Sequence, residues 1–140
     1  MGNQADHLNS LLVGELSAVK TYEMALDNAV KSPEAVSTLE NCKMCHAKRA
    51  SKLTEMISSI GGKPAEGSGA WGAFAKTVEA GATALGEKAA IGSIKEGEDH
   101  GMELYRSEIK NLEGNVLNFV ESELFPAQER TRDAIAGLAA

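Results

Sequence analysis

Apolar residues that recur every three or four positions are the feature that most constrains how this chain can fold. This spacing follows one face of an α-helix, and the sequence shows it in four separate stretches. In the first stretch the apolar residues are Leu8, Leu11, Leu12, Leu16, Val19, Tyr22, Leu26, Ala29 and Val30. The pattern and its capping residues predict helices from Asp6 to about Val30, from Ser32 to Gly61, from about Glu87 to Leu112 and from Asn115 to Gly137.

Four helices that each carry one apolar stripe are best buried as a four-helix bundle, so the predicted fold is all-α and antiparallel. Short links join the first pair and the last pair, whereas a long Gly-rich connection joins the two resulting hairpins. We expect one short extra helix in this crossover, over Ala73 to Leu85, and Trp71 as an anchor. Pro126 is expected to bend the last helix, because it removes the bond to the Ser122 carbonyl.

Size and charge narrow the range of functions. The chain has 140 residues, of which 43% are hydrophobic, so residues 1–140 are expected to form one domain. Its net charge of −6 gives no basic field for nucleic acid or anionic lipid, and no stretch is long and apolar enough to span a bilayer. The sequence as written indicates a cytoplasmic protein, or a periplasmic one if a signal peptide was removed.

An internal repeat singles out two acidic residues. Gly14-Glu15-x6-Tyr22 returns as Gly97-Glu98-x6-Tyr105 in the third helix, which suggests duplicated hairpins. Glu15 and Glu98 lie on the apolar stripes, where an isolated carboxylate must be neutralised, paired or bound to a metal. Alternatively, each lies at the edge of its stripe and reaches water. The tyrosines either orient these carboxylates or are ordinary core residues.

His46 lies on the inner stripe of the second helix, at the level of the two carboxylates. It is either a satisfied core residue or a ligand. Other charged and polar residues are predicted to be solvated, namely His7, His100, the cluster Lys48-Arg49 with Lys52, and the cluster Glu129-Arg130 with Arg132-Asp133.

Four segments carry a resemblance to a known group of proteins. These are LLVGELSAVKTYEMAL, GSGAWGAFAK, IKEGEDHGMELY and LFPAQERTRD. The chain resembles the ferritin-like superfamily, and most closely a bacterial ferritin-like family of unknown function. The resemblance implies Glu15, His46 and Glu98 as metal ligands, with iron or zinc as the ion. Lys43, Gln128 and Thr131 stand where the other three ligands of a di-iron site belong, so the resemblance implies no full di-iron chemistry.

The sequence Cys42-Lys43-Met44-Cys45-His46 allows a different cofactor. C-x-x-C-H is the attachment sequence of c-type haem, with the histidine as axial ligand. The same Cys42, Cys45 and His46 could instead bind Zn²⁺ with a carboxylate, the two thiols could form a redox disulfide, or both could fill core space.

Three functions remain open at this stage. The first is a metal-binding or stress-related bundle with a degenerate site of Glu15, His46 and Glu98, expected to form a homo-oligomer. The second is a c-type cytochrome for electron transfer. The third is a purely structural, oligomerising bundle.

Overall fold

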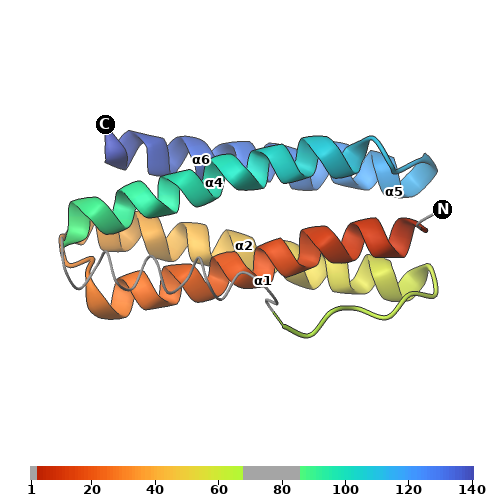
Figure 1. Cartoon of the computed structure of the whole chain (residues 1–140), viewed down its shortest axis with the longest axis horizontal. Helices are drawn as coiled ribbons and strands as arrows, with labels where there is room; N and C mark the ends of the chain where they lie inside the picture. Colours follow the sequence, from red (N-terminus) through yellow and green to blue (C-terminus); the bar gives the residue numbers. More distant parts are fainter. Residues whose placement is uncertain (1–2, 68–85) are drawn as a thin grey trace.

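The computed structural model describes residues 3–67 and 86–140, and within these ranges the chain is helical without any strand. Four long helical segments lie side by side (Figure 1). They are α1 (Gln4–Asn28), α2 (Pro33–Ser59), α4 (Glu87–Ile109) and a composite segment of α5 (Gly114–Phe119), the π-helix η2 (Val120–Leu124) and α6 (Phe125–Ala139). The expected anchor Trp71 and the expected helix from Ala73 to Leu85 lie outside the described residues.

The first two helices begin with different capping groups. Asn3, not Asp6, caps α1, because its side-chain oxygen accepts the Asp6 backbone N–H at 2.9 Å. Asp6 instead lies in the first turn, where a carboxylate stabilises the positive end of the helix dipole. In α2, Ser32 is the N-cap residue and Pro33 the first helical residue, as the sequence predicts.

The last helical segment differs from the single helix, bent at Pro126, that the sequence predicts. Gly114, which lies between the third and fourth predicted helices, adopts a positive φ of 61° and begins α5. One π-helical turn then precedes Pro126, and the Phe125 N–H bonds to the carbonyl of Val120, five residues back. This turn shifts the register of α6 just before the proline, where an α-helical bond would be missing.

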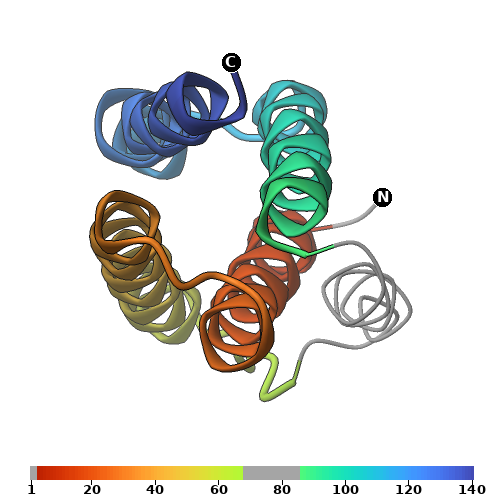
Figure 2. The same cartoon turned by 90° about the vertical axis from the view of Figure 1, so that its left-hand side faces the viewer.

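The four helical segments lie around a common centre (Figure 2). A layer of buried polar side chains divides the core there into two apolar clusters. One apolar cluster, around Leu39 and Ile135, fills the end of the bundle where the short link joins α1 to α2. The other cluster, around Leu8 and Val120, fills the opposite end. Between them lie buried polar side chains from α1, α2, α4 and α6, which are Glu15, Tyr22, His46, Arg49, Glu98, Tyr105, Gln128 and Thr131. This polar layer is the candidate functional site.

Outside the polar layer, side chains also link the first hairpin to α4 near each end of the bundle. Near the α4 N-terminus, Glu87 accepts hydrogen bonds from the backbone N–H groups of Lys31 and Ser32. Toward the other end, His7 Nδ1 lies 2.7 Å from Glu108 Oε2, so His7 is half-buried and paired rather than solvated. In the described part of the chain, the helices are all too short or too polar to cross a bilayer.

Candidate functional site

Glu15, His46 and Glu98 meet in the dry middle of the bundle, as the sequence predicts. Each is only 3% exposed. His46 stands between the two carboxylates, with Nδ1 at 2.5 Å from Glu15 Oε1 and Nε2 at 2.6 Å from Glu98 Oε2. The imidazole of α2 therefore joins a carboxylate of α1 to one of α4. Hydrogen bonding at both nitrogens fits an imidazolium that donates twice.

The two repeat tyrosines cross over between the hairpins. Tyr22 donates to Glu98 Oε2 at 2.6 Å, and Tyr105 donates to Glu15 Oε2 at 2.5 Å. Each phenol therefore binds the carboxylate of the other repeat, although Tyr22 follows Glu15 in the sequence. Both phenols are buried and hydrogen-bonded to carboxylates, so of the two alternatives open from the sequence the structure favours the one in which they orient the carboxylates.

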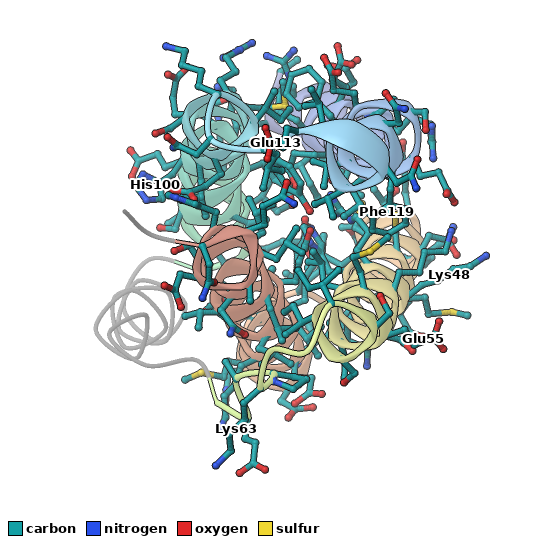
Figure 3. All side chains as sticks on the ribbon, turned by 90° about the vertical axis from the view of Figure 1, so that its right-hand side faces the viewer. Lys48, Glu55, Lys63, His100, Glu113 and Phe119 are labelled. Atoms are coloured by element: carbon teal, nitrogen blue, oxygen red, sulfur yellow. The ribbon has the colours of Figure 1, made fainter. Side chains whose placement is uncertain are left out.

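Arg49 is the member of the polar layer that the sequence analysis placed wrongly. It was expected on a solvated face with Lys48, but it is 2% exposed, whereas Lys48 points outward (Figure 3). Arg49 follows His46 by three residues and precedes the buried Leu53 by four, so the helical period itself puts it on the inner stripe. The helical spacing therefore indicated an inward Arg49. Two inward carboxylates, which need a cation, were a physical reason to expect it there.

The Arg49 guanidinium contacts polar side chains of α1, α2 and α6. Its Nη1 donates to Gln128 Oε1 at 2.7 Å, and its Nη2 donates to Thr131 Oγ1 at 3.1 Å. Nη2 also lies 2.8 Å from His46 Nδ1, and Nε lies 3.4 Å from Glu15 Oε2. The Nε contact lacks hydrogen-bond geometry, so this buried donor is unsatisfied.

The α6 residues supply neutral donors to Glu98. Thr131 donates to Glu98 Oε1 at 2.8 Å, and the Gln128 amide donates to the same oxygen at 3.1 Å and to the Glu98 backbone carbonyl at 2.9 Å. A Cβ at Gly101 would lie 2.7 Å from this amide nitrogen, so the absent side chain at Gly101 makes room for it. Gln128 and Thr131, at the positions where a di-iron site would need a Glu and a His, therefore supply groups that hydrogen-bond to a carboxylate.

Opposite charges keep the buried acids and bases ionised. Burial disfavours the charged carboxylate of Glu15, but Arg49 and His46 outweigh burial and lower its pKa. Burial also opposes protonation of His46, yet the facing carboxylates raise its pKa. For Glu98, the hydrogen bond from His46 leads the interactions that lower the pKa against burial. Two carboxylates, one imidazolium and one guanidinium then have formal charges that cancel.

This arrangement does not fit a resident metal ion. Ligand atoms that share one ion at about 2.1 Å stand roughly 3 Å apart, whereas the two nitrogens of His46 face two different carboxylates at shorter range. The remaining oxygen of Glu15 accepts from Tyr105, and that of Glu98 accepts from Thr131. Among the described residues, no group of three or more His, Cys, Asp or Glu side chains has the geometry to hold a metal.

The C-x-x-C-H sequence does not fit haem attachment in this arrangement either. A haem iron needs a free ring nitrogen of His46, and both nitrogens lie against carboxylates inside the bundle. Both cysteines are free thiols, with Cys42 buried and Cys45 half-buried. Burial, together with the nearby Glu98 charge, raises the pKa of Cys42 to about 11, so this thiol is unreactive at neutral pH.

A narrow cavity lies against the polar layer between α1 and α4. It has room for a few water molecules, about 40 Å³, and is partly open to solvent. Small residues of both helices line it, including Gly14, Ala18 and Gly101, and it reaches the side chains of Glu15 and Glu98. The cavity therefore provides the polar layer with a route toward solvent.

Comparison with known proteins places the chain in a family without assigning it an activity. No curated protein and no solved structure matches it. One family model does match, over residues 3–111, and its description is "Domain of unknown function (DUF2383)". The match spans α1, α2 and α4 and includes Glu15, His46, Arg49 and Glu98. Because it covers most of the chain, this protein belongs to the DUF2383 family.

Proposed function

We propose that this chain is a ferritin-like bundle that works as a metal-independent structural module. The observation that carries the proposal is the position of Arg49. Its guanidinium lies within salt-bridge distance of the Glu15 carboxylate and contacts the His46 ring. The formal charges of the polar layer that contains it cancel. Removing either a carboxylate or the guanidinium would leave a buried charge uncompensated, so the layer holds the hairpins in one register.

We also propose the antiparallel arrangement of two hairpins that is typical of ferritin-like proteins. The chain path in Figure 1 supports it, because α1 and α2 are joined by a short link at one end and pack along their length. α4 and α6 pack together in the same way. The Gly-Glu-x6-Tyr repeat with its crossed hydrogen bonds also supports a duplicated hairpin.

The proposal is tested by removing metal from the whole protein. Metal-stripped protein, prepared with a strong chelator, is expected to melt at the same temperature as untreated protein. It should also gain no stability from added Fe²⁺ or Zn²⁺, since a ligand stabilises only the state that binds it. A clear loss of melting temperature on chelation, restored by one of these ions, would overturn the proposal and favour the metal-binding alternative.

Other sequence-based predictions stay predictions. Iron or zinc binding at Glu15, His46 and Glu98 requires Arg49 to move, and covalent haem at Cys42 and Cys45 requires His46 to turn out of the bundle. An absorption spectrum combined with intact mass tests the haem alternative. Self-association, a stress-related role and a cytoplasmic location are predictions too, and sedimentation of the purified protein tests the first of them.

A further inference from the structure

Cys42 and Cys45 are free thiols on α2 that take no part in the charge balance of the polar layer. We propose that they form a redox pair, in which Cys45 reacts with a peroxide and Cys42 then closes a reversible disulfide within the chain. This role goes beyond the structural role of the polar layer and does not depend on it. The spacing of the two cysteines, their different exposure and the charge beside Cys45 support it.

The two cysteines are close enough along α2 to be bridged. They lie three residues apart within one helix, and each thiol is within electrostatic range of the other. Helical geometry puts their Cα atoms about 5 Å apart, inside the range of about 4.4–6.8 Å that is usual for disulfides. Their Cβ atoms are about 5–6 Å apart, against about 3.5–4.5 Å in a disulfide, so the bridge must tighten this turn. A strained bridge is easily reduced, as a reversible pair requires.

The two thiols differ in their access to solvent, which gives them different roles. Cys42 is only 4% exposed and belongs to the apolar cluster around Leu39, whereas Cys45 is half-buried. A dissolved peroxide can therefore reach Cys45 more easily than Cys42. Burial also raises the pKa of Cys42 to about 11, which keeps this thiol from attacking an oxidant directly. Cys42 is therefore the resolving thiol of the pair.

A cation lies beside the more accessible thiol. Arg49 follows Cys45 by four residues, so the two share one helix face, and the guanidinium interacts electrostatically with Cys45. The thiolate is the form that attacks a peroxide, and the guanidinium is near the negative charge on that sulfur. Cysteines that respond to oxidants are typically accessible, close to a cation and next to a resolving cysteine.

The proposed reaction has two steps, and the peroxide is its oxidant. The Cys45 thiolate attacks one oxygen of hydrogen peroxide, the O–O bond breaks, and the other oxygen leaves as hydroxide and takes up a proton to become water. Cys45 is then a sulfenic acid. The Cys42 sulfur attacks the Cys45 sulfur, the S–S bond forms, and the S–OH oxygen leaves with the Cys42 proton as a second water. Two thiols are oxidised by two electrons, and one peroxide is reduced to two waters.

Closing the bridge would disturb the polar layer, because His46 directly follows Cys45 in α2. The imidazole makes short contacts with Glu15 and Glu98, at 2.5 and 2.6 Å. Tightening the turn between the two cysteines displaces the imidazole from this position. The oxidised protein is therefore expected to be less stable than the reduced protein.

The test treats the reduced full chain with equimolar hydrogen peroxide and follows its intact mass. Wild type is expected to lose the mass of two hydrogens together with both free thiols, and to regain them with dithiothreitol. Cys42→Ala should stop at a sulfenic acid, which dimedone traps. Cys45→Ala is the matched control, since it also replaces one thiol by a small apolar group, and its buried thiol should stay unmodified.

Three results would overturn the redox pair. In the first, both thiols of wild type stay free while only the exposed Met44 gains an oxygen. In the second, Cys45→Ala is oxidised as readily as Cys42→Ala. In the third, a non-reducing gel shows that the disulfide joins two chains.

Two further measurements complete the test. If Cys42→Ala does not fold, dimedone is added to wild type during oxidation, and peptide mapping is expected to find the adduct on Cys45; an adduct on Cys42 would overturn the assignment. The melting temperature of wild type should fall on oxidation and recover on reduction, while that of Cys45→Ala does not change. Oxidised wild type that melts no lower than the reduced protein would contradict the effect on the polar layer.

Discussion

The carboxylates of Glu15 and Glu98 occupy matching positions of a sequence repeat, yet they are stabilised in different ways. Both accept a hydrogen bond from His46 and one from a tyrosine of the other repeat. Glu15 then faces the Arg49 guanidinium, while Glu98 receives neutral donors from α6. The repeat has an acid at both positions, but the surrounding helices give Glu15 a charged partner and Glu98 a set of neutral hydrogen bonds.

The largest expected effect separates these two acids by removing the charge of each. Glu15→Gln leaves Arg49 buried without its carboxylate, so it is expected to lower the free energy of unfolding by about 3–5 kcal/mol. Glu98→Gln lets His46 become neutral and leaves Arg49 paired, so about 1–3 kcal/mol is expected. Urea unfolding of both variants measures the difference.

A surface substitution calibrates that comparison. Glu23 is exposed on α1, and Glu23→Gln should change the free energy of unfolding by no more than about 0.5 kcal/mol. If Glu98→Gln proves as costly as Glu15→Gln, the distinction between a charged and a neutral environment is wrong.

Removing the tyrosine hydroxyls tests the same difference between Glu15 and Glu98, with smaller expected losses of stability. Tyr105→Phe removes the only neutral donor to the Glu15 carboxylate recorded among the described residues, and about 2 kcal/mol of stability should be lost. Tyr22→Phe leaves Glu98 with Thr131 and Gln128, so about 1 kcal/mol is expected. Thermal melts of the two single variants would contradict the account if Tyr22→Phe were the more damaging.

The pH dependence of stability tests the imidazolium. The lowered pKa values of Glu15 and Glu98 add stability above the usual 4.5, and this is lost as the pH falls through the folded pKa. The raised pKa of His46 adds stability below the usual 6.5, and this is lost as the pH rises from 6.5 through the folded pKa. Stability is therefore expected to peak between these two values.

Replacing the imidazole isolates its part in that profile. Unfolding measured at about pH 6 and about pH 9 should show a decline for wild type that is missing in His46→Gln. An identical alkaline decline in the variant would assign it to other groups.

The smallest effect is expected on α6. Thr131→Val keeps the shape of the side chain but removes the hydroxyl that links Glu98 to Arg49, at a cost of about 1 kcal/mol. Thr54→Val provides a matched control, because Thr54 is an exposed residue whose hydroxyl donates to the Ala50 carbonyl of its own helix. Equal losses for the two variants would show that the Thr131 hydroxyl adds nothing specific to the polar layer.

The sequence predicted those parts of the site that follow from helical periodicity. Glu15, His46 and Glu98 could be placed inward because each lies on an apolar stripe, and a repeat marks both acids. Arg49 was missed because adjacent Lys48 made the pair look like a solvated basic face. The crossed tyrosine pairing could not be predicted, because spacing within one helix does not specify which side chain of another helix it meets.

Some helix boundaries could likewise be predicted from the sequence, and others could not. Ser32 and Pro33 mark a start that local chemistry alone determines, and α2 begins there. The π-helical turn before Pro126 depends on how the last helix packs, and the sequence showed only that the regular bond would be lost.

The central claim is that the protein's own guanidinium, and no metal, neutralises the buried carboxylates. The most direct test is a crystal structure grown with excess Mn²⁺ and examined for anomalous scattering at the manganese edge. The account predicts the Arg49 guanidinium between Glu15 and His46 with no anomalous peak beside them. A manganese peak coordinated by Glu15, His46 and Glu98, with Arg49 turned away, would contradict it.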